Sequence, residues 1–270
     1  MNTSPDKDTP KPAATVIILR DEPSYEVLMV TRHANMAFGA SAWVFPGGKI
    51  GPADSASEWD DVVDGELPLE ERAKRIGAAR EVFEETGLLL ARRPGEERLV
   101  DADVAEKLGE YRLKVEDEPE LFVKLLKQEG LLLALDRLTP FAHWVTPKIE
   151  KRRYNTYFYI VRAPRRQVAT HDGREAVDHN WAAPADVLKS AEKGEAKLML
   201  PTRLNLEWLA DASNCDEALN AAQTRNIVTV EPQLDIREDG AYLLLPKEAG
   251  YSIHEELVDA ALGGAKPARP

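Results

Sequence analysis

The chain has 270 residues, of which 43% are hydrophobic and 30% are charged, a composition typical of a globular protein. Its formal net charge of −12 excludes a general nucleic-acid binder, because phosphate backbones require a basic surface, whereas a small anionic substrate needs only a local basic pocket. No apolar stretch approaches the roughly 20 residues of a membrane-spanning helix, so we expect neither a nucleic-acid nor a membrane partner.

The first segments of the chain predict strands. Residues 1–12 are polar and proline-rich, lack the apolar core of a signal peptide, and are expected to form a disordered leader. Residues 13–20 and 25–33 are rich in β-branched and apolar residues and flank a turn, which predicts a strand and its returning partner. A short strand at 42–45 runs into the tight turn Phe45-Pro46-Gly47-Gly48.

A helix is predicted over 69–90. The segment before it, 51–70, is polar and acidic without clear periodicity, and we interpret it as a surface insertion. One face of the helix is apolar and lies opposite a run of glutamates, so that one side packs and the other is free for chemistry. The apolar face consists of Ile76, Ala79, Val82 and Phe83.

The second half alternates between helical and strand patterns. Helical spacing over 97–136, broken by Pro119 and Gly130, predicts an insertion of two or three short helices. We expect one domain over 13–252, followed by a helix turn and flexible tail over 253–270. Strands are predicted at 138–146, 153–161 and 176–181, helices at 184–193, 202–210 and 216–222, and strand-like alternation at 227–246. The single cysteine, Cys215, excludes an internal disulfide and fits a reducing, cytoplasmic setting.

The run from Arg80 to Gly87 is the most informative stretch of the chain. Glu81, Glu84 and Glu85 are three and four positions apart on the predicted helix, so their carboxylates converge. Like charges that close repel one another unless a cation lies among them. A hard divalent ion with oxygen ligands, Mg²⁺ or Mn²⁺, is the natural candidate.

These motifs resemble the signature of the Nudix hydrolases. That signature places a glycine, five residues, a glutamate and seven residues before Arg-Glu, an apolar residue, any residue, Glu-Glu, any residue, Gly and an apolar residue. The stretch from Arg80 to Leu88 matches every specified position, and Gly48 matches the opening glycine. The resemblance implies an α/β/α sandwich with a mixed sheet, here with a helical insertion and a C-terminal extension.

The upstream half of the signature departs from the pattern. Five residues separate Gly48 from Asp54, which stands where glutamate is usual, and 25 residues rather than seven separate Asp54 from Arg80. Counting back from Arg80 instead places the glutamate position at Arg72, which cannot ligate a metal. The source of this carboxylate stays open among Asp54, Glu70 and Glu71.

The interrupted signature is similar to one Nudix branch in particular, which includes a peroxisomal coenzyme A diphosphatase and bacterial relatives. The likeness extends to Val44-Phe45-Pro46-Gly47-Gly48, to the segment 141–147 (Phe-Ala-His-Trp-Val-Thr-Pro) and to the segment 153–158 (Arg-Tyr-Asn-Thr-Tyr-Phe). The branch implies hydrolysis of coenzyme A or acyl-CoA at the diphosphate. Alternatives are hydrolysis of ADP-ribose, nucleotide sugars or dinucleotides, or a non-catalytic nucleotide-binding regulator.

The resemblance also implies roles for individual residues. Glu81, Glu84, Glu85 and the Gly48 carbonyl would bind the divalent ion, and Glu84 is our first choice for the general base. Glu175 is the alternative base or a further metal ligand. Arg80 would pair with Glu84 and hold the cluster in place. Gly87 would end the catalytic turn.

A further group of residues could contact the substrate. The basic residues that could bind the substrate phosphates are Arg32, Lys49, Arg152 and Arg153. The aromatic residues that could stack on an adenine are Trp43, Trp144 and Tyr157, although core packing is the better explanation for them. His33 and His143 lie beside strands, without metal-ligand spacing. The small-molecule diphosphate is the expected partner, and a homodimer is left open.

Overall fold

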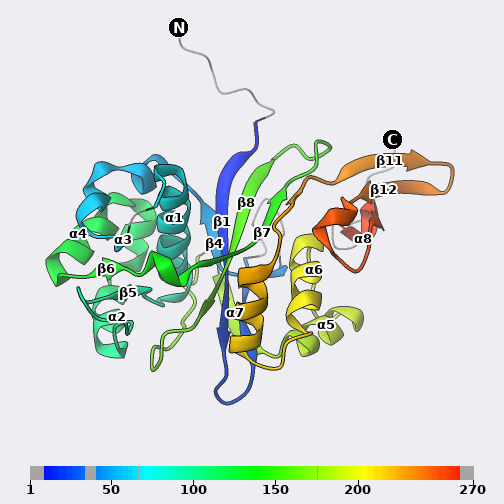
Figure 1. Cartoon of the computed structure of the whole chain (residues 1–270). Helices are drawn as coiled ribbons and strands as arrows, with labels where there is room; N and C mark the ends of the chain where they lie inside the picture. The colour runs from blue at the N-terminus through cyan, green and yellow to red at the C-terminus, as the bar shows by residue number, and fades with distance from the viewer. Residues whose placement is uncertain (1–8, 34–40, 66, 175, 262–270) are drawn as a thin grey trace, which may run out of the picture.

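A mixed eight-stranded sheet runs through the centre of the molecule, with helices on both faces (Figure 1). The computed structural model describes residues 9–33, 41–65, 67–174 and 176–261. The strand order is β10-β7-β8-β1-β2-β3, with β4 also pairing with β1 and β9 with β2. These strands are β1 (Lys11–Arg20), β2 (Glu26–Arg32), β3 (Trp43–Val44), β4 (Gly47–Lys49), β7 (Thr139–Val145), β8 (Tyr154–Arg162), β9 (Ala176–Ala182) and β10 (Thr229–Val230).

Strand β1 is the centre of this sheet. It runs parallel to β8 over all but its last residue, from the pair Lys11↔Tyr154 to Leu19↔Arg162. Side chains alternate between the two faces of a strand, so Val16 and Ile18 enter one core while Ile17 and Leu19 enter the other. Burial on both faces explains why this strand is an almost continuous apolar run.

Each core is covered by its own set of helices. One face carries α1 (Leu69–Thr86), α2 (Ala102–Gly109), α3 (Arg112–Asp117) and α4 (Glu120–Glu129). The other face carries α5 (Pro184–Glu192), α6 (Leu200–Leu209), α7 (Cys215–Thr224) and, at the C-terminal end, α8 (Val258–Ala261). Within the described part of the chain, no helix has the length and apolarity needed to cross a membrane.

Short elements complete the fold. A three-stranded antiparallel sheet is formed by β11 (Gln233–Arg237), β12 (Gly240–Leu244) and β13 (Glu255–Leu257), and a two-stranded one by β5 (Ala91–Arg92) and β6 (Leu132–Leu133). The 3-10 turns are η1 (Pro52–Ser55), η2 (Ser57–Asp61), η3 (Leu135–Arg137) and η4 (Lys247–Ala249). The C-terminal extension is tied to the main sheet, because Trp144 Nε1 donates to the Tyr251 hydroxyl at 3.0 Å.

Most predicted elements are present, with shifted ends. Strand β1 begins at Lys11, inside the expected leader, and residues 1–8 and 262–270 lie outside the described part. Helix α1 ends at Thr86 rather than at residue 90, because Gly87 adopts a left-handed conformation with φ of 71°. The predicted helical insertion contains the three helices α2, α3 and α4.

The segment 51–70 differs most from expectation. The prediction of a surface insertion is wrong for its middle part, because Trp59 is only 1% exposed and Val62 is also buried. The Trp59 indole packs edge-on against Phe122, with ring centroids 6.0 Å apart, and its Nε1 donates to the Ala53 carbonyl at 2.8 Å. The insertion is therefore held between α1 and α4 as part of the core.

The lone cysteine is a core residue. Cys215 begins α7 and is fully buried. Burial raises the pKa of its thiol to about 12, and the neighbouring Asp21 carboxylate adds to this shift. Because the thiolate is the reactive form, Cys215 is not suited to nucleophilic chemistry.

Replacing Trp59 tests whether the insertion is structural. Trp59→Ala would leave a large cavity beside Phe122, and we expect the free energy of unfolding to fall by about 3–5 kcal/mol. The measurement is urea-induced unfolding followed by circular dichroism. Leu69→Ala is the control, because Leu69 is 64% exposed and its truncation should change stability by no more than about 0.5 kcal/mol. Equal stabilities of the two variants would contradict the packing described here.

Candidate active site

The glycine turn and the glutamate helix meet because β4 pairs with β1. Gly48 lies opposite Ala14 and Gly47 opposite Thr15, which places both glycines beside α1. The Gly47 amide donates to Glu85 Oε2 at 2.9 Å. A Cβ atom on Gly48 would lie 2.3 Å from Glu81 Oε2, so the missing side chain is what allows this approach.

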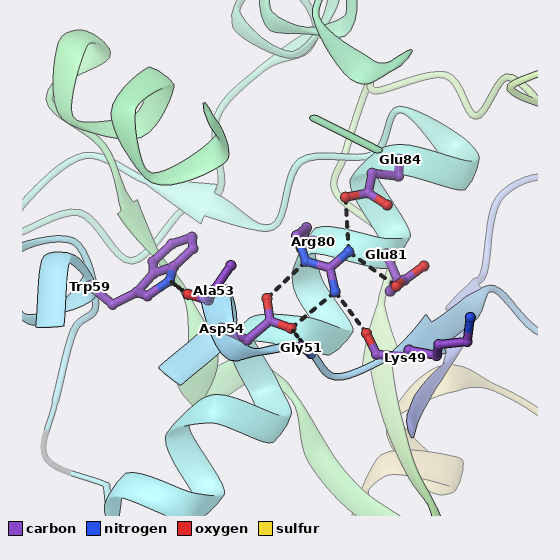
Figure 2. A network of polar contacts seen from close by, with 8 residues as sticks. All are labelled: Lys49, Gly51, Ala53, Asp54, Trp59, Arg80, Glu81 and Glu84. Carbon is purple, nitrogen blue, oxygen red and sulfur yellow. Dashed lines mark hydrogen bonds and ion pairs between the residues drawn. The ribbon is translucent and has the colours of Figure 1, made fainter. Parts of the chain in front are cut away.

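Arg80 lies at the centre of a buried polar network (Figure 2). It is 4% exposed, and its Nε and Nη2 donate to the two oxygens of Asp54 at 2.8 and 3.0 Å. Its Nη1 donates to Glu84 Oε1 at 2.9 Å and to Glu81 Oε1 at 3.0 Å. Its Nη2 also donates to the Lys49 carbonyl at 2.8 Å, which joins the helix to the end of β4.

The charge of Arg80 is secured by this network. Burial by itself would lower the pKa of Arg80, but the hydrogen bond with Asp54 and the charges of Glu81, Asp54 and Glu84 raise that pKa above its ordinary value. A buried charge is tolerated when it is paired and hydrogen-bonded. Arg80 is therefore a fixed cation within a cluster of carboxylates.

Of the three carboxylates left open by the sequence, only Asp54 reaches Arg80. Its Oδ2 also accepts from the Gly51 amide at 2.8 Å, and the side chain is 1% exposed. Glu70 pairs instead with Lys74 at 2.9 Å, and Glu71 with Arg75 at 2.9 Å. Asp54 thus binds Arg80 on the side opposite Glu81 and Glu84 (Figure 2), and it is not among the residues that line the adjacent cavity.

That cavity has a volume of about 250 Å³ and lies over the C-terminal half of α1. Five carboxylates surround it from three segments: α1 supplies three, α3 supplies Glu116, and the loop before β9 supplies Asp172. The cations in its wall are Lys49 and Arg80. The full lining consists of Lys49, Gly51, Arg80, Glu81, Glu84, Glu85, Glu116, Pro119 and Asp172.

Glu116 and Asp172 were not predicted from the sequence. No motif marks either residue, because each depends on how its segment packs over α1. Asp172 belongs to the loop in which Glu175 was predicted to act, and Glu175 itself lies outside the described residues. The carboxylate of Asp172 accepts from the Arg174 and Ala176 amides, which shapes this loop. Glu116 Oε2 lies 3.4 Å from Arg174 Nη1.

The surroundings of Glu84 change the acidity of its carboxyl. Burial raises the pKa of its carboxyl, Arg80 opposes this, and the charges of Asp54 and Glu116 raise it further. The net direction is upward. A carboxylate with a raised pKa is a stronger base than an exposed one, which suits proton transfer from water.

The donor set suits a hard divalent cation. All the side chains that could ligate an ion in this cavity are carboxylates, and the five of them outnumber the two cations. Among the residues that the structure describes, no three acidic, histidine or cysteine side chains are already arranged around one point. Arg80 Nη1 donates to both Glu81 and Glu84, and the Gly47 amide donates to Glu85.

The predicted phosphate-binding residues are dispersed. Lys49 lines the cavity, whereas Arg32, Arg152 and Arg153 are not among its lining residues. Arg153 donates to Glu231 Oε1 at 2.6 Å and to the Thr146 carbonyl at 3.0 Å, so its guanidinium joins the β7–β8 turn to the segment after β10. Of the aromatic candidates, Trp144 is buried and Tyr157 stacks on His143 with ring centroids 4.3 Å apart.

Comparison with known proteins identifies the family. A family model described as the NUDT19 Nudix domain matches residues 63–209. The chain belongs to this Nudix family. The match begins within the segment 51–70 and includes α1 with Glu81, Glu84 and Glu85. This agrees with the Nudix signature found in the sequence.

Individual Nudix relatives extend the match. An acyl-coenzyme A diphosphatase NUDT19 from Xenopus laevis is 26% identical over 271 residues, covering 84% of this chain and 71% of the relative. The human protein of the same name is 24% identical over 274 residues, covering 84% and 72%. The crystal structure of a NUDIX hydrolase from Alicyclobacillus acidocaldarius is similar with a TM-score of 0.62 and 25% identity, covering 78% of this chain and 96% of that one. The Nudix fold and the hydrolase class expected from the sequence are confirmed.

Gly48→Ala tests the contact between turn and helix. The new Cβ would displace the Glu81 carboxylate, and a misplacement of about 1 Å in a catalytic site can cost on the order of 100-fold in rate. We expect that loss in metal-dependent hydrolysis, with little change in melting temperature, because only the end of a flexible side chain must move. Gly109→Ala is the control, since the nearest atom to its Cβ would be Arg112 Cδ at 4.0 Å. Full activity of Gly48→Ala would disprove the importance of this approach.

Proposed function

We propose that this protein is a divalent-metal-dependent diphosphatase acting on coenzyme A or an acyl-CoA. It would cleave the diphosphate and release a phosphopantetheine part and adenosine 3′,5′-bisphosphate. The proposal rests on one combination: a cavity lined by five carboxylates in a chain whose Nudix relatives include three acyl-coenzyme A diphosphatases, each matched over 84% of this chain. Because a fold does not determine a substrate, the substrate needs a direct test.

We assign the following roles to the site residues. Glu81, Glu84, Glu85 and the Gly48 carbonyl would hold the ion, Mg²⁺ or Mn²⁺. When bound, the ion neutralises diphosphate charge and lowers the pKa of an attacking water. Glu84 would accept the proton from that water, since burial and neighbouring charges already raise its pKa. Glu175 stays the alternative base.

Two cations would act beside the glutamates. Lys49 extends from the end of β4 into the cavity wall and would bind a phosphate oxygen of the substrate. Arg80 is already saturated by Asp54, Glu84, Glu81 and the Lys49 carbonyl, so its role would be to hold the glutamates rather than to bind substrate. Arg32 and Arg153 keep their predicted substrate role only if the bound diphosphate reaches beyond this cavity.

A substrate panel tests the proposed activity. The purified protein would be incubated with Mg²⁺ or Mn²⁺ and, separately, coenzyme A, acyl-CoA, ADP-ribose, a nucleotide sugar and a dinucleotide. We expect preferential cleavage of the CoA species, with adenosine 3′,5′-bisphosphate identified by mass spectrometry. Turnover of another diphosphate without CoA cleavage would replace the proposed substrate. No turnover on any member, with tight nucleotide binding, would favour a regulator.

Glu85→Gln tests the metal role of the helix. The change preserves the shape of the side chain, including an oxygen that can accept from Gly47, but it removes one negative charge from the cavity. We expect the fold to persist and metal-dependent turnover to fall by about two orders of magnitude or more. Glu70→Gln is the matched control, because Glu70 is exposed and pairs with Lys74 outside the cavity. Equal turnover in both variants would remove Glu85 from the proposed metal site.

Three expectations from the sequence stay predictions. They are a cytoplasmic location, the absence of nucleic-acid and membrane partners, and a homodimer as the open possibility for the oligomeric state. Sedimentation of the purified protein would settle the last of these.

A further inference from the structure

A second buried arginine lies directly behind the carboxylate cavity. Arg112 is the first residue of α3, in the helical insertion, and is 9% exposed. Its Nε and Nη2 donate to the Glu84 carbonyl at 3.0 and 2.8 Å. Its Nη1 donates to Thr170 Oγ1 at 2.8 Å and its Nη2 to the Thr170 carbonyl at 2.9 Å. One side chain therefore joins three segments that are far apart in the sequence.

The C-terminal turn of α1 needs such a partner. The last four carbonyls of a helix receive no hydrogen bond from an amide within the helix. The negative end of the helix dipole, which lies there, favours a nearby cation. Helix α1 has no basic residue of its own in that turn. The Phe83 carbonyl accepts from the Gly87 amide and the Thr86 carbonyl from the Thr170 amide, both at 2.9 Å. The Glu84 carbonyl accepts from Arg112, whose guanidinium also provides the cation at this end of the helix.

Gly87 leaves room for this arrangement. A Cβ atom at that position would lie 3.2 Å from Arg112 Nη1 and 3.4 Å from Thr170 Oγ1. The glycine of the Nudix signature thus does more than end the helix in this chain. It also leaves space for the Arg112 guanidinium, from the helical insertion, at the end of α1.

Each segment bonded by Arg112 carries a carboxylate of the cavity. The Glu84 carbonyl belongs to a residue whose side chain lines the cavity, and Glu85 follows it. Asp172 lies two residues beyond Thr170. Glu116 lies one helical turn beyond Arg112 on α3, on the same face. The guanidinium of Arg112 thus belongs to, or bonds with, the segments that carry four of the five carboxylates.

We propose that Arg112 is a positioning residue for the candidate metal site. By bonding the α1 terminus, its own helix and the loop at Thr170, it fixes the separation of the segments that carry Glu84, Glu85, Glu116 and Asp172. It touches no substrate atom and acts through these backbones. The inference rests on the proposed function in one respect, namely that a divalent ion binds in this cavity.

The test compares Mn²⁺ affinity with stability. Arg112→Met keeps the length and apolar stem of the side chain but removes all four hydrogen bonds, and Arg112→Lys keeps a charge without the fork of donors. Loss of a residue that orients metal ligands typically costs about 10–100-fold in metal affinity. We expect a loss of that size for Arg112→Met and a smaller one for Arg112→Lys. Mn²⁺ binding would be measured by electron paramagnetic resonance without substrate, and melting temperatures by differential scanning fluorimetry.

Arg92→Met is the matched control. Arg92 is 6% exposed and pairs with Asp64 at 2.7 Å and Asp136 at 3.0 Å, but it does not line the cavity. Its loss should lower the melting temperature and leave Mn²⁺ affinity unchanged. Unchanged Mn²⁺ affinity in Arg112→Met would overturn the proposal. The proposal would also be overturned if Arg92→Met and Arg112→Met had the same melting temperature and lost the same Mn²⁺ affinity. General destabilisation would then explain the loss.

A milder variant covers the case in which Arg112→Met does not fold. Thr170→Val removes only the hydroxyl acceptor of Arg112 Nη1 and keeps the shape of the side chain. Its Mn²⁺ affinity should fall in the same direction by a smaller factor, and an unchanged affinity would overturn the proposal. The readout is independent of the substrate. If the protein fails to cleave CoA, the Mn²⁺ measurements can still support the role of Arg112. If they fail to support that role, CoA cleavage by the unchanged protein still supports the proposed function.

Discussion

The guanidinium of Arg80 is the constraint on which the rest of the site depends. A buried cation is costly unless nearly all of its donors are satisfied, and here they reach Asp54, Glu81, Glu84 and the Lys49 carbonyl. These partners come from the segment 51–70, from α1 itself and from the end of β4. A shift of any one of these segments would leave a buried N–H of Arg80 without its acceptor. The requirement to satisfy Arg80 therefore holds helix, turn and insertion in one arrangement.

This constraint explains how the chain tolerates an interrupted signature. The cost of lengthening a connecting segment grows only slowly with its length, so extra residues between Asp54 and Arg80 need not separate them in space. The extra length is used as packing: Trp59 fills the space beside Phe122, and Phe122 in turn stacks on Phe83 of α1 at 5.0 Å. Gly77 provides the clearance, because a Cβ there would lie 3.1 Å from Asp54 Oδ2. The insertion thus contributes both to the core and to the counter-ion of Arg80.

The cavity has an excess of negative charge, and its carboxylates come from different segments of the chain. Three carboxylates come from the signature helix, one from the helical insertion and one from the loop before β9. The pairing of β4 with β1 brings the glycine turn to the first set, whereas Arg112 of the helical insertion bonds both the end of α1 and the loop at Thr170. Loops and insertions around a common catalytic helix are where substrate selection is decided.

Local features were determined by the sequence alone. The signature helix, the helical insertion and the central strands follow from periodicity, caps and turn residues, which act over a few neighbouring positions, whereas the helix ends at Thr86, four residues before its predicted end. The tertiary structure alone decided that Asp54 rather than Glu70 or Glu71 meets Arg80, that Arg153 pairs with Glu231, and that Glu116 and Asp172 face the cavity. The physical reason is that these contacts join residues far apart in the chain, and their geometry is set by how helices pack on the sheet. No spacing within the sequence encodes that packing directly.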